Sequence, residues 1–187
     1  MKNNKILIYF LIAGILHLSA VLYQIARYEI ILKTGEPYKV RTAPVDPHDF
    51  FRGKYLALRY DNTTAPVKNG DNIQSGSRAY VSLSKDKDGF AIFTELSSKP
   101  PKDRDYLRVD AASGNRFNLP YNRFYMEESI SQAVEELYFK YSQRGNWLNS
   151  NNYALLRVKG GRAVIEDLYI NGIQMRKLVE SDEKLNK

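Results

Sequence analysis

The sequence predicts an α+β fold, mainly β, in which an N-terminal transmembrane helix leads into an antiparallel β-rich domain with one amphipathic helix packed on it. Residues 6–26 are apolar and uncharged, much of the later chain alternates in short apolar and polar runs, and residues 127–143 have helical spacing. A chain of 187 residues has room for one domain and an extra segment. We therefore expect an anchor (1–33), one domain (34–180) and a charged, frayed tail (181–187).

The apolar run from Ile6 to Ala26 contains 21 residues and no Asp, Glu, Lys or Arg. At about 1.5 Å per residue, a helix of this length is roughly 30 Å long, which matches the hydrocarbon core of a bilayer. We favour an uncleaved, single-pass anchor over a cleaved signal peptide, because the run continues past the small pairs Ala13-Gly14 and Ser19-Ala20. The helix is expected to extend to Lys33 and to end at Gly35.

One histidine, His17, lies near the middle of this run. An imidazole is costly at that depth, so either a neighbouring helix or a water satisfies it, or it has a proton or ligand role. Basic residues both precede and follow the run, and the positive-inside rule therefore does not decide its orientation.

The net charge of +7 does not indicate nucleic-acid binding. Three of the 28 basic residues lie within the first 27 residues, which contain no acid, so the rest of the chain carries 25 basic against 21 acidic residues. In residues 85–88 and 102–105 basic residues alternate with acids, a pattern typical of solvated turns rather than of a basic stripe. The absence of cysteine excludes disulfides and thiolate chemistry but leaves the compartment open.

The most distinctive stretch runs from Pro44 to Asp61 and begins with a turn that contains Asp46, Pro47, Asp49 and Arg52. Proline pushes the residue before it into extended geometry, and Asp side chains are suited to bonding local backbone N–H groups. We interpret this turn as support for the strand that follows.

That strand begins after Gly53, which marks a position with φ above zero or a close backbone approach. The residues that follow alternate as Tyr55, Ala57 and Arg59 on one face and Leu56, Leu58 and Tyr60 on the other. Because few of these positions are purely polar, we expect both faces to be largely covered.

The string RGKYLALRY, preceded by VDPHDFF, resembles the signature of the GDYXXLXY family of membrane-anchored bacterial proteins. Gly53, Tyr55, Leu58 and Tyr60 match the motif, whereas Lys54 stands where the family has Asp. The strings EPYKV after the anchor and LYING near the C-terminus extend the resemblance to nearly the whole chain. It implies an outward-facing domain on one anchor in the bacterial inner (cytoplasmic) membrane, often encoded beside polytopic membrane proteins, and no established activity.

The lysine at position 54 bears on the role of the motif. An ammonium group offers no acceptor and repels cations, so Lys could not replace an Asp that acted as an acid, a base or a metal ligand. Either the family's Asp is structural or this chain has lost its chemistry, and we favour the first. The four matching residues are therefore interpreted as structural.

The remaining domain is expected to form six to eight short strands. The clearest hairpin joins Tyr153–Lys159 to Arg162–Tyr169 through Gly160-Gly161, with Ala163, Ile165 and Asp167 on one face and Val164, Glu166 and Leu168 on the other. Alternation predicts further strands at Ala79–Leu83, Phe90–Leu96 and Tyr106–Val109, and a weaker one at Phe117–Leu119. Composition predicts a loop over residues 62–76.

The single helix expected in the domain covers Glu127–Gln143, where apolar residues recur at spacings of three and four. We expect it to lie on the sheet rather than to bind a partner. The only tryptophan, Trp147, follows in a polar loop and is expected to pack beneath it.

No catalytic, cofactor or metal site is predicted. His48 with Asp46 and Asp49 could place three ligands together, but the proline turn accounts for the same residues, and zinc sites usually recruit more His or Cys. The architecture leaves a signal-peptidase-like serine/lysine hydrolase as an alternative, yet no serine lies between Ser19 and Ser75, where the nucleophile is expected. The 14 tyrosines leave a glycan- or polyanion-binding module as another, although tyrosines that alternate within strands are more simply packing residues.

We therefore expect a membrane-anchored extracytoplasmic domain that acts as a non-catalytic accessory or interaction module for another membrane protein, for which a polytopic protein is the candidate.

Overall fold

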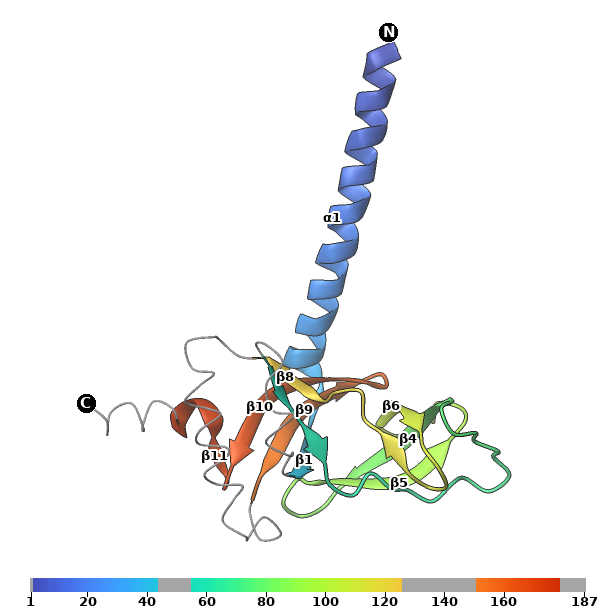
Figure 1. Cartoon of the computed structure of the whole chain (residues 1–187), viewed down its shortest axis with the longest axis vertical. Coiled ribbons are helices and arrows are strands. Elements are labelled where there is room, and N and C mark those ends of the chain that lie inside the picture. The colour runs from blue at the N-terminus through green and yellow to red at the C-terminus, as the bar shows by residue number, and fades with distance from the viewer. Residues whose placement is uncertain (1, 44–54, 126–150, 179–187) are drawn as a thin grey trace, which may run out of the picture.

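A long helix stands on a β-rich domain in the computed structural model, which describes residues 2–43, 55–125 and 151–178 (Figure 1). The helix α1 (Lys2–Thr34) projects away from the domain, and the strands gather at its C-terminal end. The predicted α+β class, mainly β with antiparallel sheets, is confirmed. The expected helix at residues 127–143, Trp147 and the tail at 181–187 lie outside the described residues.

The helix passes into the first strand through one residue, Gly35. The Gly35 N–H donates the last helical hydrogen bond to the Ile31 carbonyl at 2.8 Å, and β1 (Glu36–Ala43) begins at the next residue. A Cβ atom on Gly35 would lie 2.5 Å from the Ile31 oxygen and 3.1 Å from the backbone of Arg157. The predicted helix end is confirmed, and glycine is required there because two backbone segments meet at contact distance.

The larger sheet has the order β11-β10-β9-β1-β3, and every pairing in it is antiparallel. Its centre is the predicted hairpin of β9 (Tyr153–Lys159) and β10 (Arg162–Ile170), which is confirmed. The short strand β11 (Ile173–Gln174) extends one edge, and β3 (Arg59–Tyr60) pairs with the end of β1 on the other.

The alternation predicted along β10 holds only for its first half. Ala163 and Ile165 pair with β9 in register, but a β-bulge at Glu166 shifts the pairing, so that Leu168 instead of Asp167 continues in phase with them. The two-face assignment is therefore wrong beyond Ile165, because one extra residue in a strand reverses the direction of every side chain after it. The bulged Glu166 pairs with Arg157 at 2.6 Å.

The second sheet has the order β5-β4-β6-β7, and its hairpin is as predicted. β4 (Arg78–Lys85) and β5 (Ala91–Ser97) are joined by a turn in which the Asp86 carboxylate accepts the N–H groups of Asp88 and Phe90 at 2.9 and 2.8 Å. β6 (Tyr106–Ala111) and the weak candidate β7 (Phe117–Asn118) complete the sheet. Of the alternating charges at residues 85–88, those at 86–88 are exposed in this turn, as expected, whereas Lys85 is the partly buried end of β4 and pairs with Glu36.

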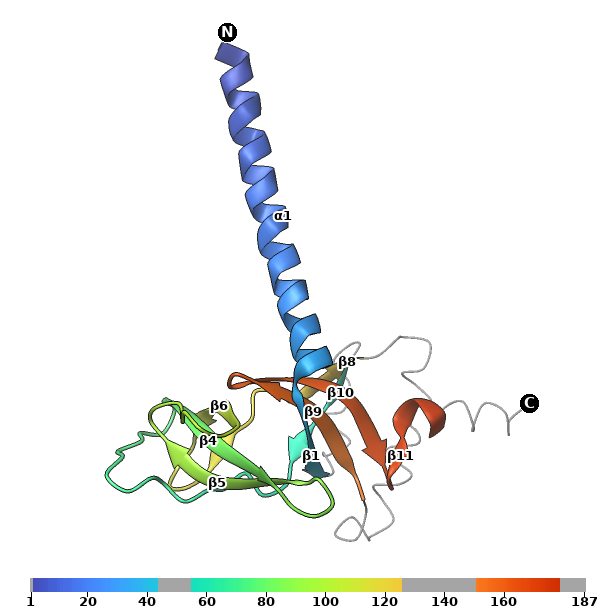
Figure 2. The same cartoon turned by 180° about the vertical axis from the view of Figure 1, so that it is seen from behind.

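A separate two-stranded ladder pairs β2 (Tyr55–Ala57) with β8 (Arg123–Tyr125), and β8 lies near the foot of α1 (Figure 2). β8 was not predicted as a strand. The described residues contain eleven strands, so the expectation of six to eight is wrong. The additional strands have only two or three residues, too few to show a period of two in the sequence.

The sheets share one core and touch at the β9–β10 turn. The Gly161 carbonyl accepts the Arg108 N–H at 2.9 Å, and the Tyr106 ring lies against Gly161, where a Cβ atom would be 2.4 Å from a ring carbon. The neighbouring Gly160 has no atom near its missing side chain. Both glycines have positive φ, 57° at Gly160 and 76° at Gly161, but only Gly161 joins two sheets.

These glycines offer a matched test of that contact. We expect Gly160→Ala to lower the free energy of unfolding by about 1 kcal/mol, the cost of a left-handed alanine. Gly161→Ala should cost about 2–4 kcal/mol, since overpacking against Tyr106 adds to the same backbone strain. Urea unfolding of the full chain in mild detergent, followed by circular dichroism, measures both. Equal losses would mean that Tyr106 swings aside and that the turn does not hold the sheets together.

Candidate functional site

The motif residues that the structure describes form a crossover between sheets rather than one strand. β2 pairs with β8 in the register Tyr55↔Tyr125, whereas β3 pairs with β1 in the register Tyr60↔Thr42. Leu58 lies between the two short strands. The motif therefore links the ladder beside the helix to the edge of the large sheet.

One face of this crossover is core. Leu56, Leu58 and Tyr60 are 0%, 5% and 9% exposed. The Leu58 N–H donates to the Asn122 carbonyl at 2.9 Å, and the Tyr60 hydroxyl donates to the Tyr121 carbonyl. Burial raises the pKa of Tyr60 far above its usual value, so this phenol is neutral at physiological pH. The buried half of the motif thus fixes the segment that leads into β8.

The other face is not covered as expected. Arg59 is exposed on β3, the edge strand of the large sheet, and Tyr55 is only partly buried in a ladder that is two strands wide. The ring centroids of Tyr55 and Tyr125 are 5.6 Å apart. The Arg123 guanidinium lies over the Tyr55 ring, 4.8 Å from its centroid. The three side chains therefore pack on one another while Tyr125 and Arg123 remain exposed to solvent.

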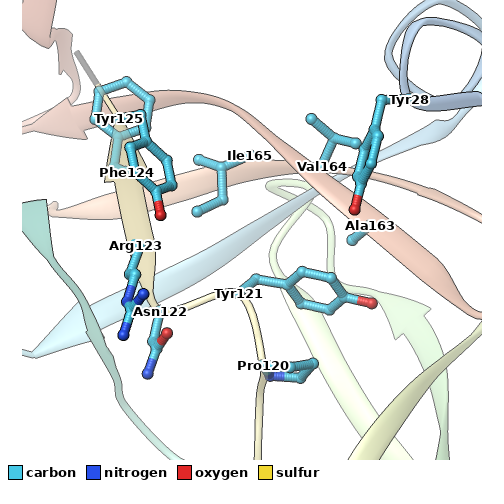
Figure 3. Close-up of a pocket in the computed structure, with 10 residues that line it drawn as sticks. All are labelled: Tyr28, Pro120, Tyr121, Asn122, Arg123, Phe124, Tyr125, Ala163, Val164 and Ile165. Carbon is cyan, nitrogen blue, oxygen red and sulfur yellow. The ribbon is translucent and has the colours of Figure 1, made fainter. Parts of the chain in front are cut away.

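Tyr125 and Arg123 also line a groove of about 490 Å³ beside the foot of α1. Figure 3 shows Tyr28 entering from the helix and Tyr121 from the opposite wall, with Ile165 of β10 between them and β8. The lining residues are Tyr28, Pro120, Tyr121, Asn122, Arg123, Phe124, Tyr125, Ala163, Val164 and Ile165. We call this the juxtamembrane groove. Apart from one arginine, its walls are aromatic, aliphatic or amide groups.

The electrostatics of the groove follow from that lining. Burial raises the pKa of Tyr121, against the opposing effects of the Ala163 backbone and of the cations Arg108 and Arg162. The phenol therefore stays neutral, and Arg123, whose guanidinium lies on the Tyr55 ring, is the charged residue among the lining residues. Such a surface suits an apolar or aromatic segment that carries a negative charge.

None of the other predicted site residues lies at this groove in the described part of the chain. Asp46, Pro47, His48, Asp49, Arg52 and Gly53 lie outside the described residues, so the supporting turn and the glycine hinge stay predictions. Within residues 2–43, 55–125 and 151–178, no group of three His, Asp or Glu side chains is placed to hold a metal ion. The imidazole of His17 is exposed on α1 and has no hydrogen-bond partner in the part of the chain that the structure describes.

The family can now be assigned. The sequence model described as GDYXXLXY protein matches residues 17–168, which include the second half of α1, the motif and the strands through most of β10. The chain belongs to the GDYXXLXY family. No curated protein and no solved structure matches it. The naming motif of this GDYXXLXY protein thus has a buried half in the core and an outer tyrosine at the rim of the juxtamembrane groove.

Sequence reasoning missed the groove itself. Its walls come from three segments far apart in the chain, namely α1, residues 120–125 and β10, and none of them signals a groove by itself. Residues 123–125, which form β8 with an exposed, a partly buried and an exposed side chain, are too few to show a strand pattern in the sequence. The pairing of β8 with the motif strand depends on contacts across about 70 residues, which no local pattern encodes.

The hydrogen bond of Tyr60 can be tested through pH. Its folded-state pKa is raised above the unfolded value of about 10, so its stabilisation is complete below pH 10 and is lost as pH rises beyond it. Tyr60→Phe should cost about 1 kcal/mol at pH 7, and this difference from the wild type should shrink above pH 10. Unfolding titrations from pH 7 to 11 measure it. The exposed Tyr125→Phe serves as control and should stay within about 0.5 kcal/mol of wild type throughout.

Proposed function

We propose that this protein is a single-pass anchored, non-catalytic accessory of the bacterial inner membrane, with its domain on the extracytoplasmic side. The juxtamembrane groove binds an extracytoplasmic segment of a polytopic membrane protein, and that segment is apolar or aromatic with at least one acidic residue.

The anchor is supported by the surface of α1. Sixteen of its large apolar side chains, from Ile6 to Ile30, are 47–73% exposed, and Ile31 at 5% is the first that the domain buries. Residues 5–34 are long and apolar enough to cross a bilayer. A continuous apolar surface of this extent has to be covered by lipid or by another helix.

The observation that carries the proposal is the absence of a linker between the helix and the domain. Only Gly35 separates α1 from β1, and Lys159 Nζ donates to Thr34 Oγ1 at 2.6 Å across the junction. The groove is therefore held at a fixed height and direction beside the helix. A partner that meets it must lie in the same layer, next to the helix, as the external loops of polytopic membrane proteins do.

The alternative functions find less support. The buried hydroxyls without a hydrogen-bond partner in the described residues, Thr42 and Ser82, are 7% and 0% exposed and offer a substrate no access. Among the described aromatic pairs, Tyr153 and Tyr169 have the shortest centroid distance, 4.6 Å, but Tyr153 is 7% exposed and is a buried residue instead of an open platform for a sugar.

Extraction tests the anchor. Mild detergent should release the protein from isolated membranes, because α1 is held by apolar burial, whereas 1 M salt should leave it in the pellet, because salt screens only charge interactions. Immunoblots of the two supernatants decide the point. Release by salt would mean a peripheral attachment.

Site-specific crosslinking in intact membranes tests the partner. A photoreactive residue at Tyr125, 66% exposed in the groove, should capture a polytopic membrane protein, identified by mass spectrometry. The same residue at Ile92, 46% exposed on β5 and away from the groove, is the control. Arg123→Glu should reduce capture at Tyr125 at least fivefold, since it opposes the expected acidic partner. Equal capture at both positions, or no polytopic protein among the products, would refute the proposal.

A further inference from the structure

We propose that a second groove, on the neighbouring side of α1, binds one anionic phospholipid through its phosphate. This groove has a volume of about 300 Å³ and lies between the helix and the β9–β10 turn. Its lining residues are Tyr23, Ala26, Arg27, Ile30, Ile31, Lys159, Gly160 and Arg162. The inference rests on the anchor in the proposed function, but it does not depend on the protein partner.

The position along the helix places this groove at the level of the lipid headgroups. The uncharged run ends at Ala26, and Arg27 is the first charged residue after it. From Arg27 to Ile31 the helix rises about 6 Å, which is close to the thickness of one headgroup layer. Tyr23 lies one turn deeper, where interfacial aromatic residues are usual.

Three cations meet in this groove without an anion from the protein. In the described part of the chain, no carboxylate lies within ion-pair distance of Arg27, Lys159 or Arg162. The nearest helix carboxylate, Glu29, is two residues or about 200° round the helix from Arg27, and it pairs with Lys33 at 3.0 Å. Cations gathered at one place are repulsive unless an anion joins them.

Of the three cations, Lys159 is hydrogen-bonded and Arg162 is partly buried before any ligand arrives. Lys159 donates to Thr34 Oγ1, which itself donates to the Ile30 carbonyl at 2.7 Å, so two N–H groups of this ammonium remain for a ligand. Arg162 is partly buried at the start of β10, beside a turn that is fixed by its contact with β6. A site with prepositioned cations loses little entropy on binding a phosphate.

The remaining wall is apolar and continues along the membrane span. Ala26, Ile30 and Tyr23 lie on the same helix face, and Tyr23 and Ile30 are 68% and 54% exposed. An acyl chain can follow this face while its phosphate stays at the turn. A free phosphate ion would use the cations but leave the apolar wall uncovered, so we commit to a lipid headgroup.

The test uses the full-length protein in detergent micelles, titrated with phosphatidylglycerol or phosphatidylcholine of the same acyl chains and examined by native mass spectrometry. One phosphatidylglycerol should remain bound, at least about tenfold more tightly than phosphatidylcholine. Arg162→Gln and Lys159→Gln should each weaken it about fivefold, whereas Arg162→Lys should retain most of the affinity. The exposed loop residues Arg104 and Lys102, changed to Gln, are matched controls and should have no effect.

Three results would overturn the inference. Equal binding of the two lipids, or equal weakening by Arg104→Gln and Arg162→Gln, would indicate only diffuse attraction. Displacement of phosphatidylglycerol by millimolar inorganic phosphate would indicate a free-anion site. Variants that unfold are identified by circular dichroism, and Arg27→Gln then replaces them. Crosslinking at Tyr125 in the Arg162→Gln protein separates the two proposals, because the partner should still be captured when the lipid is lost.

Discussion

The structure depends on one constraint, the direct passage from helix to strand at Gly35. The carbonyl of Ile31 and the backbone of Arg157 both approach this residue so closely that a Cβ atom has no space. Strand β1, which is the second strand from the edge of the large sheet, therefore begins at the helix end. Any tilt of the helix must be transmitted to the sheet, since no flexible residues lie between them to absorb it.

The same constraint explains why the GDYXXLXY motif lies where it does. The first motif strand, β2, pairs with β8 and the next, β3, pairs with the end of β1, so the motif connects the ladder near the helix to the large sheet. Leu58 and Tyr60 fix that connection from within, and Tyr55 packs on the rim of the juxtamembrane groove. A structural role of this kind does not require a carboxylate at position 54, where this chain has lysine.

The sequence was sufficient wherever a pattern was local. The uncharged run, the Gly160-Gly161 hairpin and the Asp86 turn were predicted because spacing and turn chemistry are encoded within a few residues. It was insufficient at Glu166, where a bulge reversed the faces of β10, and at Arg59, which alternation placed in a covered strand but which is exposed. Both outcomes depend on what the partner strands do. The two grooves were out of reach for the same reason, since each combines α1 with a turn or strand more than 90 residues away.

A rigidly held groove changes what a partner must supply. Two proteins in one membrane already share a plane and an axis, and a domain without a linker also has a fixed orientation, so docking loses little rotational freedom. A small aromatic surface with one arginine can then give specific association where the same contact in solution would be too weak. A phospholipid at Arg27, Lys159 and Arg162 would restrict the remaining motion, because it would tie the β9–β10 turn to the headgroup layer. Ligands in both grooves would therefore restrict the same quantity, the angle between the domain and the membrane.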